Sequence, residues 1–281
     1  MEKLTLSSIH LYPLKSCAAL SVPKAQLLPA GLAGDRRWML VDETGKFLTQ
    51  RDYPAMATIR ALPNLLGLTL SAPGRSPCDV SFPSPGALRV PVSVWQSVLE
   101  LPVANDQVNA WCSRTMHRPV RLVYLDDDSL RAVDARYAQP GDTVSLADGF
   151  AVLIATSASL AALNAHLPEP VPMDRFRPNL VIDGAQPWGE DGWRRIRIGD
   201  VELELVKPCA RCKITQVDQQ TGMATSQEPI RTLRQLRFAP HYSGVLFGVN
   251  ATPRCTGWLE VGQPVEILET RIPPELRQKE A

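Results

Sequence analysis

The stretch RIRIGDVELEL, residues 195–205, decides the fold of this chain. Apolar residues alternate with charged ones on both sides of the dipeptide Gly199-Asp200, which favours a tight turn between two paired strands. The pattern predicts a β-hairpin with one buried face and one face exposed to water. The residues of the buried face are Ile196, Ile198, Val201, Leu203 and Leu205.

Short strands are predicted along most of the remaining chain. Alternating patterns indicate strands at residues 66–70 and 90–94 and a second hairpin at residues 38–49, and further strands are expected near residues 4–12, 120–125, 245–249 and 264–268. The 25 prolines among 281 residues also favour short strands, because proline interrupts the interior of a helix.

Helical spacing of apolar residues occurs in only three places. Asn105 can cap one helix, and Thr156 or Ser157 can cap a second, which we expect to continue through Leu167 until Pro168 ends it. A third short helix is expected within residues 228–238. The predicted fold is therefore mainly β with a few short helices, in the α+β class.

The length of the chain predicts two structural units, since 281 residues exceed the usual size of a single core. A polar stretch from Asp126 to Asp142 contains a Pro-Gly pair and indicates a surface loop close to a domain boundary. We place one domain at residues 1–120, a second at residues 121–270, and a C-terminal tail at residues 271–281.

Charge and hydropathy exclude several classes of partner. The 30 basic and 29 acidic residues give a net charge of +1, which provides no general attraction for nucleic acid or anionic membranes. No apolar run reaches the roughly 20 residues of a membrane span, and the first residues lack the apolar block of a secretory signal. We expect a cytoplasmic protein that binds neither nucleic acid nor membrane.

The basic residues comprise 23 arginines and 7 lysines. Arginine binds carboxylate or phosphate through a planar pair of hydrogen bonds, which lysine cannot form. The excess of arginine over lysine therefore points to a localised anion site. The alternative is that the composition of the genome alone accounts for the large number of arginines.

Only two of the six cysteines, Cys209 and Cys212, lie close together in the sequence. A zinc site would need a second pair of Cys or His, and a thioredoxin-type redox pair would begin a helix. A third interpretation is that one thiolate binds a soft transition metal beside Lys207, Arg211 and Lys213, since neighbouring cations favour a thiolate and suit an anionic cofactor.

Four motifs together resemble the molybdenum cofactor sulfurase C-terminal (MOSC) domain family. They are YPLKSC at residues 12–17, GDRRWMLVD at 34–42, RFRPNL at 175–180, and CARCKITQVD at 209–218 followed by Thr221-Gly222. Within the family, the chain is similar to the bacterial YcbX-like proteins and the mitochondrial amidoxime-reducing component. The resemblance implies a MOSC β-barrel preceded by an N-terminal MOSC-type β-barrel.

The resemblance also implies a molybdenum-molybdopterin cofactor, with Cys212 as metal ligand and catalytic residue directly before a short strand that ends in Val-Asp. The cofactor contacts that it implies are Lys15, Ser16, Arg36, Thr156, Ser157, Arg177 and Asn179, and Arg211 adds a further cation. Cationic side chains and a helix start suit the terminal phosphate of such a cofactor. Structural alternatives remain, because Arg36 could simply pair with Asp35, and Thr156 or Ser157 could be a plain helix cap.

The activity implied by the resemblance is the reduction of N-hydroxylated compounds, such as hydroxylaminopurines, amidoximes or hydroxamates. The sequence lacks the C-x4-C-x2-C spacing of an iron-sulfur domain, so we expect no such cluster in this chain. Electrons would come from a separate ferredoxin, flavodoxin or flavin reductase. The alternatives are a non-catalytic MOSC module that carries or delivers the cofactor or sulfur, with a persulfide on Cys212, and a β-barrel binding protein without metal.

Overall fold

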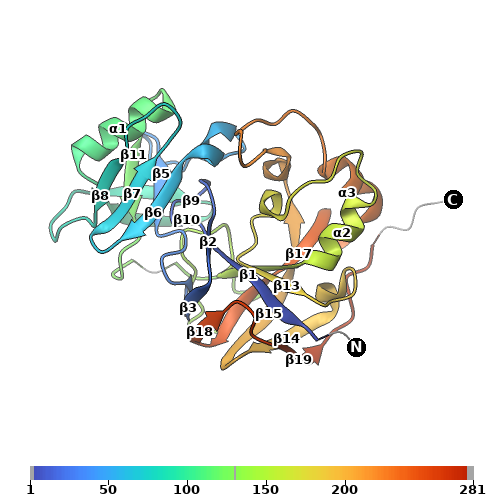
Figure 1. Ribbon diagram of the computed structural model, residues 1–281. Coiled ribbons are helices and arrows are strands. Elements are labelled where there is room, and N and C mark those ends of the chain that lie inside the picture. Colours follow the sequence, from blue (N-terminus) through green and yellow to red (C-terminus); the bar gives the residue numbers. More distant parts are fainter. Residues whose placement is uncertain (1–2, 130, 277–281) are drawn as a thin grey trace.

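The computed structural model of the chain describes residues 3–129 and 131–276 (Figure 1). In Figure 1, helix α1 (Asp106–Met116) and a group of small sheets lie at the upper left, and a large sheet lies at the lower right with helices α2 (Ser157–Asn164) and α3 (Ile230–Leu236) beside it. Strands predominate and the described α-helices are short, which confirms the mainly β fold class.

The large sheet contains nine strands that come from both ends of the chain. Their order is β19 (Val265–Thr270), β14 (Trp193–Ile198), β15 (Val201–Arg211), β17 (Gly244–Cys255), β12 (Val152–Thr156), β13 (Leu180–Asp183), β1 (Thr5–Leu11) and β2 (Leu20–Val22), with β16 (Phe238–Ala239) paired to β17. The backbone N–H of Leu6 donates to the carbonyl of Gln263 at 2.9 Å, and that of Val265 donates to Leu4 at 2.9 Å. These bonds join β1 to the beginning of β19 and close the sheet into a barrel.

The hairpin predicted at residues 195–205 is confirmed as β14 and β15. Ile196 faces Leu203 and Ile198 faces Val201 across the pair, and the predicted inward side chains are all buried. The charged residues between them, such as Arg197 opposite Glu202, stay on the outer face. The alternation of the sequence therefore specified both the register and the buried face.

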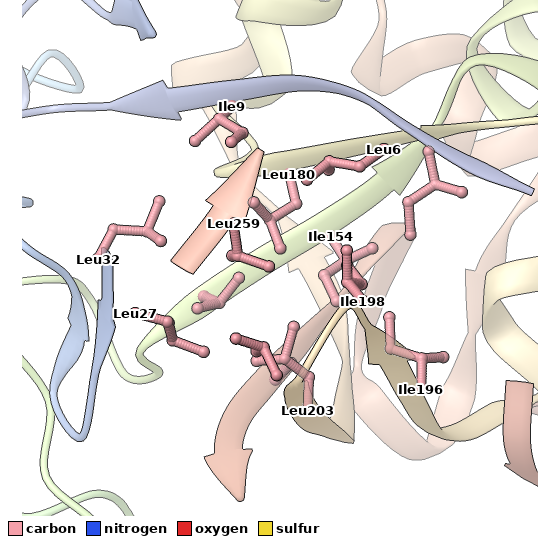
Figure 2. Close-up of a cluster of buried hydrophobic side chains, with 14 of the residues drawn as sticks. Leu6, Ile9, Leu27, Leu32, Ile154, Leu180, Ile196, Ile198, Leu203 and Leu259 are labelled. Atoms are coloured by element: carbon pink, nitrogen blue, oxygen red, sulfur yellow. The ribbon is translucent and has the colours of Figure 1, made fainter. Parts of the chain in front are cut away.

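The barrel interior is filled by aliphatic side chains from strands that are distant in sequence. Figure 2 shows Leu6 and Ile9 of β1 beside side chains of β12, β13, β14 and β15. A small sheet of β18 (Gly257–Glu260), β3 (Lys24–Leu28) and β4 (Gly31–Leu32) adds Leu27, Leu32 and Leu259 to the same core. Burial of this apolar surface is the main stabilising contribution to the barrel.

The other lobe is built from three small sheets, of which two share a core with α1 and the third packs in a separate apolar cluster. The sheets pair β5 (Trp38–Val41) with β11 (Arg121–Tyr124), β6 (Arg60–Asn64) with β7 (Gly67–Ser71) and β8 (Cys78–Ser81), and β9 (Arg89–Val94) with β10 (Ser97–Pro102). The Asn105 side chain accepts a hydrogen bond from the Val108 N–H and caps α1, as predicted. The second predicted hairpin is only half formed, because residues 47–49 make a single bridge from Phe47 to Val41 instead of a strand.

The remaining helical segments of the described residues are short turns. Five are 3-10 helices: η1 (Pro54–Thr58), η2 (Met173–Phe176), η3 (Gly189–Gly192), η4 (Lys213–Gln216) and η5 (Pro240–Tyr242). Helix α2 starts at the predicted Thr156 cap but ends at Asn164, earlier than Pro168. The segment after Cys212 is the turn η4 and not the short strand that was expected.

Strands that are distant in the sequence pair with each other. Strands β1 to β4, all within the first 32 residues, pack with the barrel formed mainly by the second half. The domain limits at residues 120 and 270 stay predictions. Among the described residues, no helix has the length and apolar character needed to span a bilayer.

The barrel core predicts a sharp difference between two neighbouring isoleucines. Ile196 is fully buried, whereas its register partner Ile267 on β19 is 37% exposed. We expect Ile196→Ala to lower the free energy of unfolding by about 2–5 kcal/mol, because it leaves a cavity in the core. Ile267→Ala should cost about 1 kcal/mol or less. Urea denaturation of both variants measures the difference, and equal losses would contradict the assigned core.

Candidate functional site

A cavity of about 660 Å³, including the space at its mouth, is lined by segments from across the chain. Most of the residues that the motifs singled out meet at this cavity. They are Lys15, Ser16, Arg36, Arg177, Asn179 and Arg211, and Cys209 lies with them.

Two arginines of the cavity pack against the ring of one tyrosine. The guanidinium carbons of Arg36 and Arg177 lie 4.1 Å and 4.3 Å from the ring centroid of Tyr12. The buried Tyr12 hydroxyl donates to the carbonyl of Pro178 at 3.0 Å. Burial raises the pKa of Tyr12 to about 12, so the ring stays neutral. Cation–π contacts therefore hold two like charges close together at the cavity wall.

Three residues of the cavity have left-handed backbone conformations. The φ angles are 62° at Ser16, 46° at Arg36 and 55° at Arg177. Such a conformation costs roughly 1–3 kcal/mol for a residue other than glycine, and it persists where the surrounding structure enforces it. Strain of this kind gathers at binding and catalytic sites, which favours a functional role for the cavity.

Asn179 and Asp35 position the Arg36 side chain. The Arg36 guanidinium donates to the Asn179 side-chain oxygen at 3.0 Å and to the Asp35 carboxylate at 2.5 Å. The other Asp35 oxygen accepts the Tyr12 N–H at 2.8 Å. The Asp35 partner considered from the sequence is thus present, and Arg36 nevertheless lines the cavity.

A continuous chain of contacts leads from the cavity to Cys212. Lys15 Nζ lies 2.6 Å from one oxygen of Asp148, and the other Asp148 oxygen accepts from Arg51 at 2.8 Å. Arg51 also donates through Nε to the sulfur of Cys212 at 3.3 Å. Cys212 follows directly on β15, is partly exposed, and carries a free thiol. Cys212 itself is not among the residues that line the cavity, and Arg51 connects its thiol to the lining residue Asp148.

Asp148 and Arg51 were not predicted from the sequence. They lie in separate polar loops that are far from each other and from Cys212 in the sequence. No spacing of residues therefore indicated that they meet. Desolvation alone would raise the pKa of Asp148, but the charges of Lys15 and Arg51 outweigh it and hold that pKa below its usual range. The carboxylate is thereby kept ionised and bridges the two cations.

Two further guanidinium groups of the cavity have no carboxylate partner within the described part of the chain. Arg177 donates to the side-chain oxygen of Gln219 at 3.1 Å. Arg211 donates to the sulfur of Cys209 at 2.8 Å and to the carbonyl of Phe176 at 2.7 Å, and its buried Nε makes no hydrogen bond. Buried positive charge without a counter-ion favours an anionic ligand, so these residues fit a phosphorylated cofactor.

Thr156 and Ser157 are not among the residues that line this cavity, and their contact with a cofactor stays a prediction. Thr156 is fully buried, accepts the Ser159 N–H at 3.2 Å, and donates to the Glu190 carboxylate at 3.0 Å. The same carboxylate also accepts the Ser159 hydroxyl at 2.7 Å. Thr156 therefore caps helix α2, as its sequence position allows.

The loop of residues 145–149 lines the cavity, and Arg131 holds it in place. The buried Arg131 guanidinium donates to the carbonyls of Ser145 at 3.0 Å and Asp148 at 2.9 Å, and also to that of Ala147. On the cavity side, Lys15 Nζ donates to the carbonyl of Leu146 at 2.7 Å. Burial lowers the pKa of Lys15 to about 8, against the opposing effect of Asp148.

Comparisons with known proteins agree with the motifs. A model described as the MOSC N-terminal beta barrel domain matches residues 3–119, and a model described as the MOSC domain matches residues 141–266. The chain is 31% identical over 280 residues to mitochondrial amidoxime-reducing component 1 of Danio rerio, covering 94% of this chain and 86% of that protein. For the protein of that name from Homo sapiens, the identity is 30% over 279 residues, with 94% and 83% covered.

A second kind of relative matches over only part of its own length. The chain is 32% identical over 289 residues to the molybdenum cofactor sulfurase of Oryza sativa subsp. japonica. The match covers 92% of this chain but 35% of that protein.

The pKa of Lys15 predicts how anion binding depends on pH. Lys15 is charged below pH 8 and loses its charge above it, so the association constant for inorganic phosphate should fall by up to about tenfold per pH unit above 8. Lys15→Arg should remove this dependence, because a guanidinium stays charged. Calorimetric titrations between pH 7 and 9.5 measure both proteins. A wild-type affinity that is constant over this range would contradict the role of Lys15.

Proposed function

Since the chain belongs to the MOSC family, we propose that it is a molybdenum-cofactor-dependent reductase of N-hydroxylated compounds. The observation that carries the proposal is the line of contacts from Lys15 through Asp148 and Arg51 to Cys212. It joins a cationic cavity to a partly exposed thiol, which is the combination that a phosphorylated metal cofactor needs. The substrates would be amidoximes, hydroxamates or hydroxylaminopurines.

Names of the relatives support this chemistry. Proteins called mitochondrial amidoxime-reducing components match nearly the whole chain at about 30% identity, and they have no more than a fifth of their own length outside the match. A separate ferredoxin, flavodoxin or flavin reductase as electron donor is part of the proposal, as is a cytoplasmic location.

Different residues would bind different parts of the cofactor. Arg177 and Arg211, which have no carboxylate partners among the described residues, would neutralise its phosphate together with Lys15. Cys212 would give the molybdenum a thiolate ligand, and the bound cofactor would supply the two-electron chemistry that removes oxygen from the substrate.

Arg51 and Asp148 would act on the thiol. The Nε–H of Arg51 points at the Cys212 sulfur, and Nη2 of the same guanidinium donates to Asp148. The bond to Asp148 fixes the plane of the Arg51 guanidinium, and the bond from Nε then restricts the orientation of the Cys212 side chain. Arg131 fixes the Asp148 backbone, so this direction is set before any cofactor binds.

A second candidate function is a non-catalytic module that carries the cofactor or a persulfide on Cys212. The similarity to a molybdenum cofactor sulfurase favours it. Such a module would bind the cofactor but leave an amidoxime unchanged when it is supplied with an artificial electron donor. Turnover of benzamidoxime by the cofactor-loaded protein would exclude this candidate.

Substitution of the two neighbouring cysteines tests the ligand. Cys212→Ser should abolish benzamidoxime reduction and remove most of the molybdenum, a loss larger than the roughly 10- to 100-fold caused by removing an outer partner of a metal ligand. Cys209→Ser should keep much of both, since Cys209 lines the cavity and accepts from Arg211 but has no contact with Arg51. Elemental analysis and steady-state assays measure the two properties.

The two cysteine variants distinguish between the possible assignments of the metal ligand. If both variants lost metal and activity equally, or if Cys209→Ser alone lost them, Cys212 would not be the ligand. If the wild-type protein contained molybdenum but did not reduce benzamidoxime, the second candidate function would replace the first.

A further inference from the structure

An exposed tryptophan projects from the hairpin of β9 and β10 beside the Cys212 end of the site. Trp95 and Gln96 form a two-residue turn, because Val94 and Ser97 are paired across the hairpin. The Trp95 side chain is 53% exposed although it is large and apolar. Its φ angle is 56°, a left-handed conformation at a turn position that favours glycine.

Contacts on both strands of the hairpin hold this turn in place. The Ser93 N–H donates to the carbonyl of Gly45 at 3.0 Å, and a side chain at Gly45 would come within 2.1 Å of the Pro91 carbonyl oxygen. Only glycine permits this approach. On the other strand, the Ser97 hydroxyl accepts from Nε of Arg131 at 3.2 Å.

These two attachments connect the turn to the site already described. Gly45 is two residues before Phe47, whose ring lies 5.0 Å from Lys15 Nζ and 5.4 Å from the Trp95 ring. Arg131 binds the Asp148 carbonyl at 2.9 Å. The position of Trp95 is therefore tied to the same groups that hold Lys15 and Asp148.

Arg51 joins the tryptophan to the thiol. Its guanidinium carbon lies 5.0 Å from the centre of the Trp95 ring, while its Nε donates to the Cys212 sulfur at 3.3 Å. A single guanidinium group thus separates the indole from the sulfur. The indole contacts Phe47 and Arg51 and leaves the rest of its surface to solvent.

We infer that Trp95 is a stacking platform for the planar aromatic part of the substrate and makes the site favour aromatic N-hydroxylated compounds over small aliphatic ones. This inference rests on the proposed function. A purine or phenyl ring stacked on the exposed indole would lie beside the thiol, whereas an acetohydroxamate has no ring to stack. Trp95 is then a specificity-determining residue, which accounts for a strained and exposed tryptophan in this turn.

The experiment compares 6-N-hydroxylaminopurine with acetohydroxamic acid in steady-state assays of the loaded protein with an artificial electron donor. The dissociation constant of 6-aminopurine, the product, is measured by calorimetry and requires no turnover. The variants are Trp95→Ala, Trp95→Phe and Trp95→Gly. The matched control is Trp258→Ala, because Trp258 is 56% exposed and also lies over a cation, Lys24 at 5.4 Å, but belongs to the β18 sheet.

We expect Trp95→Ala and Trp95→Gly to raise the KM for hydroxylaminopurine and the Kd for aminopurine about tenfold, within the range of one lost base stack. The kcat for the purine and all constants for acetohydroxamate should change less than about twofold, and Trp95→Phe should restore most of the affinity. Trp258→Ala should behave like the wild type. Trp95→Gly should melt at the wild-type temperature or higher, because glycine relieves the left-handed backbone.

The inference would be overturned if Trp95→Ala and Trp95→Gly left the purine constants unchanged, or weakened both substrates equally. A wild-type protein that reduced neither compound would instead refute the proposed function, and the aminopurine Kd would still decide whether Trp95 stacks a base. Should Trp95→Ala fail to fold, Trp95→Gly provides the same comparison without the backbone strain.

Discussion

The pairing of the N-terminal strand β1 with β13 is the constraint on which the rest of the structure depends. The strands are antiparallel, with Ile9 opposite Leu180, so the end of β1 lies beside the beginning of β13. Tyr12 follows the first strand directly and Arg177 shortly precedes the second, and this is why they meet although 165 residues separate their positions in the sequence. On its other side, β1 closes the barrel through residues 262–265. The same pairing therefore completes the core and assembles one wall of the site.

The electrostatics of the site follow from an unequal distribution of charge within a nearly neutral protein. Lys15, Arg36, Arg177 and Arg211 line one cavity, whereas Asp148 is the carboxylate among its lining residues. Concentrating like charges costs free energy unless rings and counter-ions compensate for it. Tyr12 separates two of the cations, and Asp148 bridges Lys15 to Arg51. What remains is uncompensated positive charge at Arg177 and Arg211, beside a thiol, and an anionic metal cofactor would satisfy both.

Local patterns in the sequence were reliable wherever short-range physics decides the structure. Alternation at residues 195–205 specified a hairpin and its buried face, and Asn105 and Thr156 capped helices as their side chains allow. The same reasoning failed for residues 47–49 and for the segment after Cys212, where packing against distant elements replaced strand pairing with a bridge and a 3-10 turn. The contact of Thr156 and Ser157 with a cofactor stays a prediction, and the observed partner of the Thr156 hydroxyl is the Glu190 carboxylate.

By itself, the sequence determined the mainly β class, the buried face of the central hairpin, and the motifs that place Lys15, Arg36, Arg177 and Cys212 in one family pattern. Each of these depends on residue type and on spacing within a few positions. Only the tertiary structure decided that Arg51 contacts Cys212, that the loop of residues 147–149 lines the cavity, and that Arg51 lies over the Trp95 ring. Those contacts join residues up to 161 positions apart, and closure of the barrel and packing of the two lobes set them, which no local periodicity encodes.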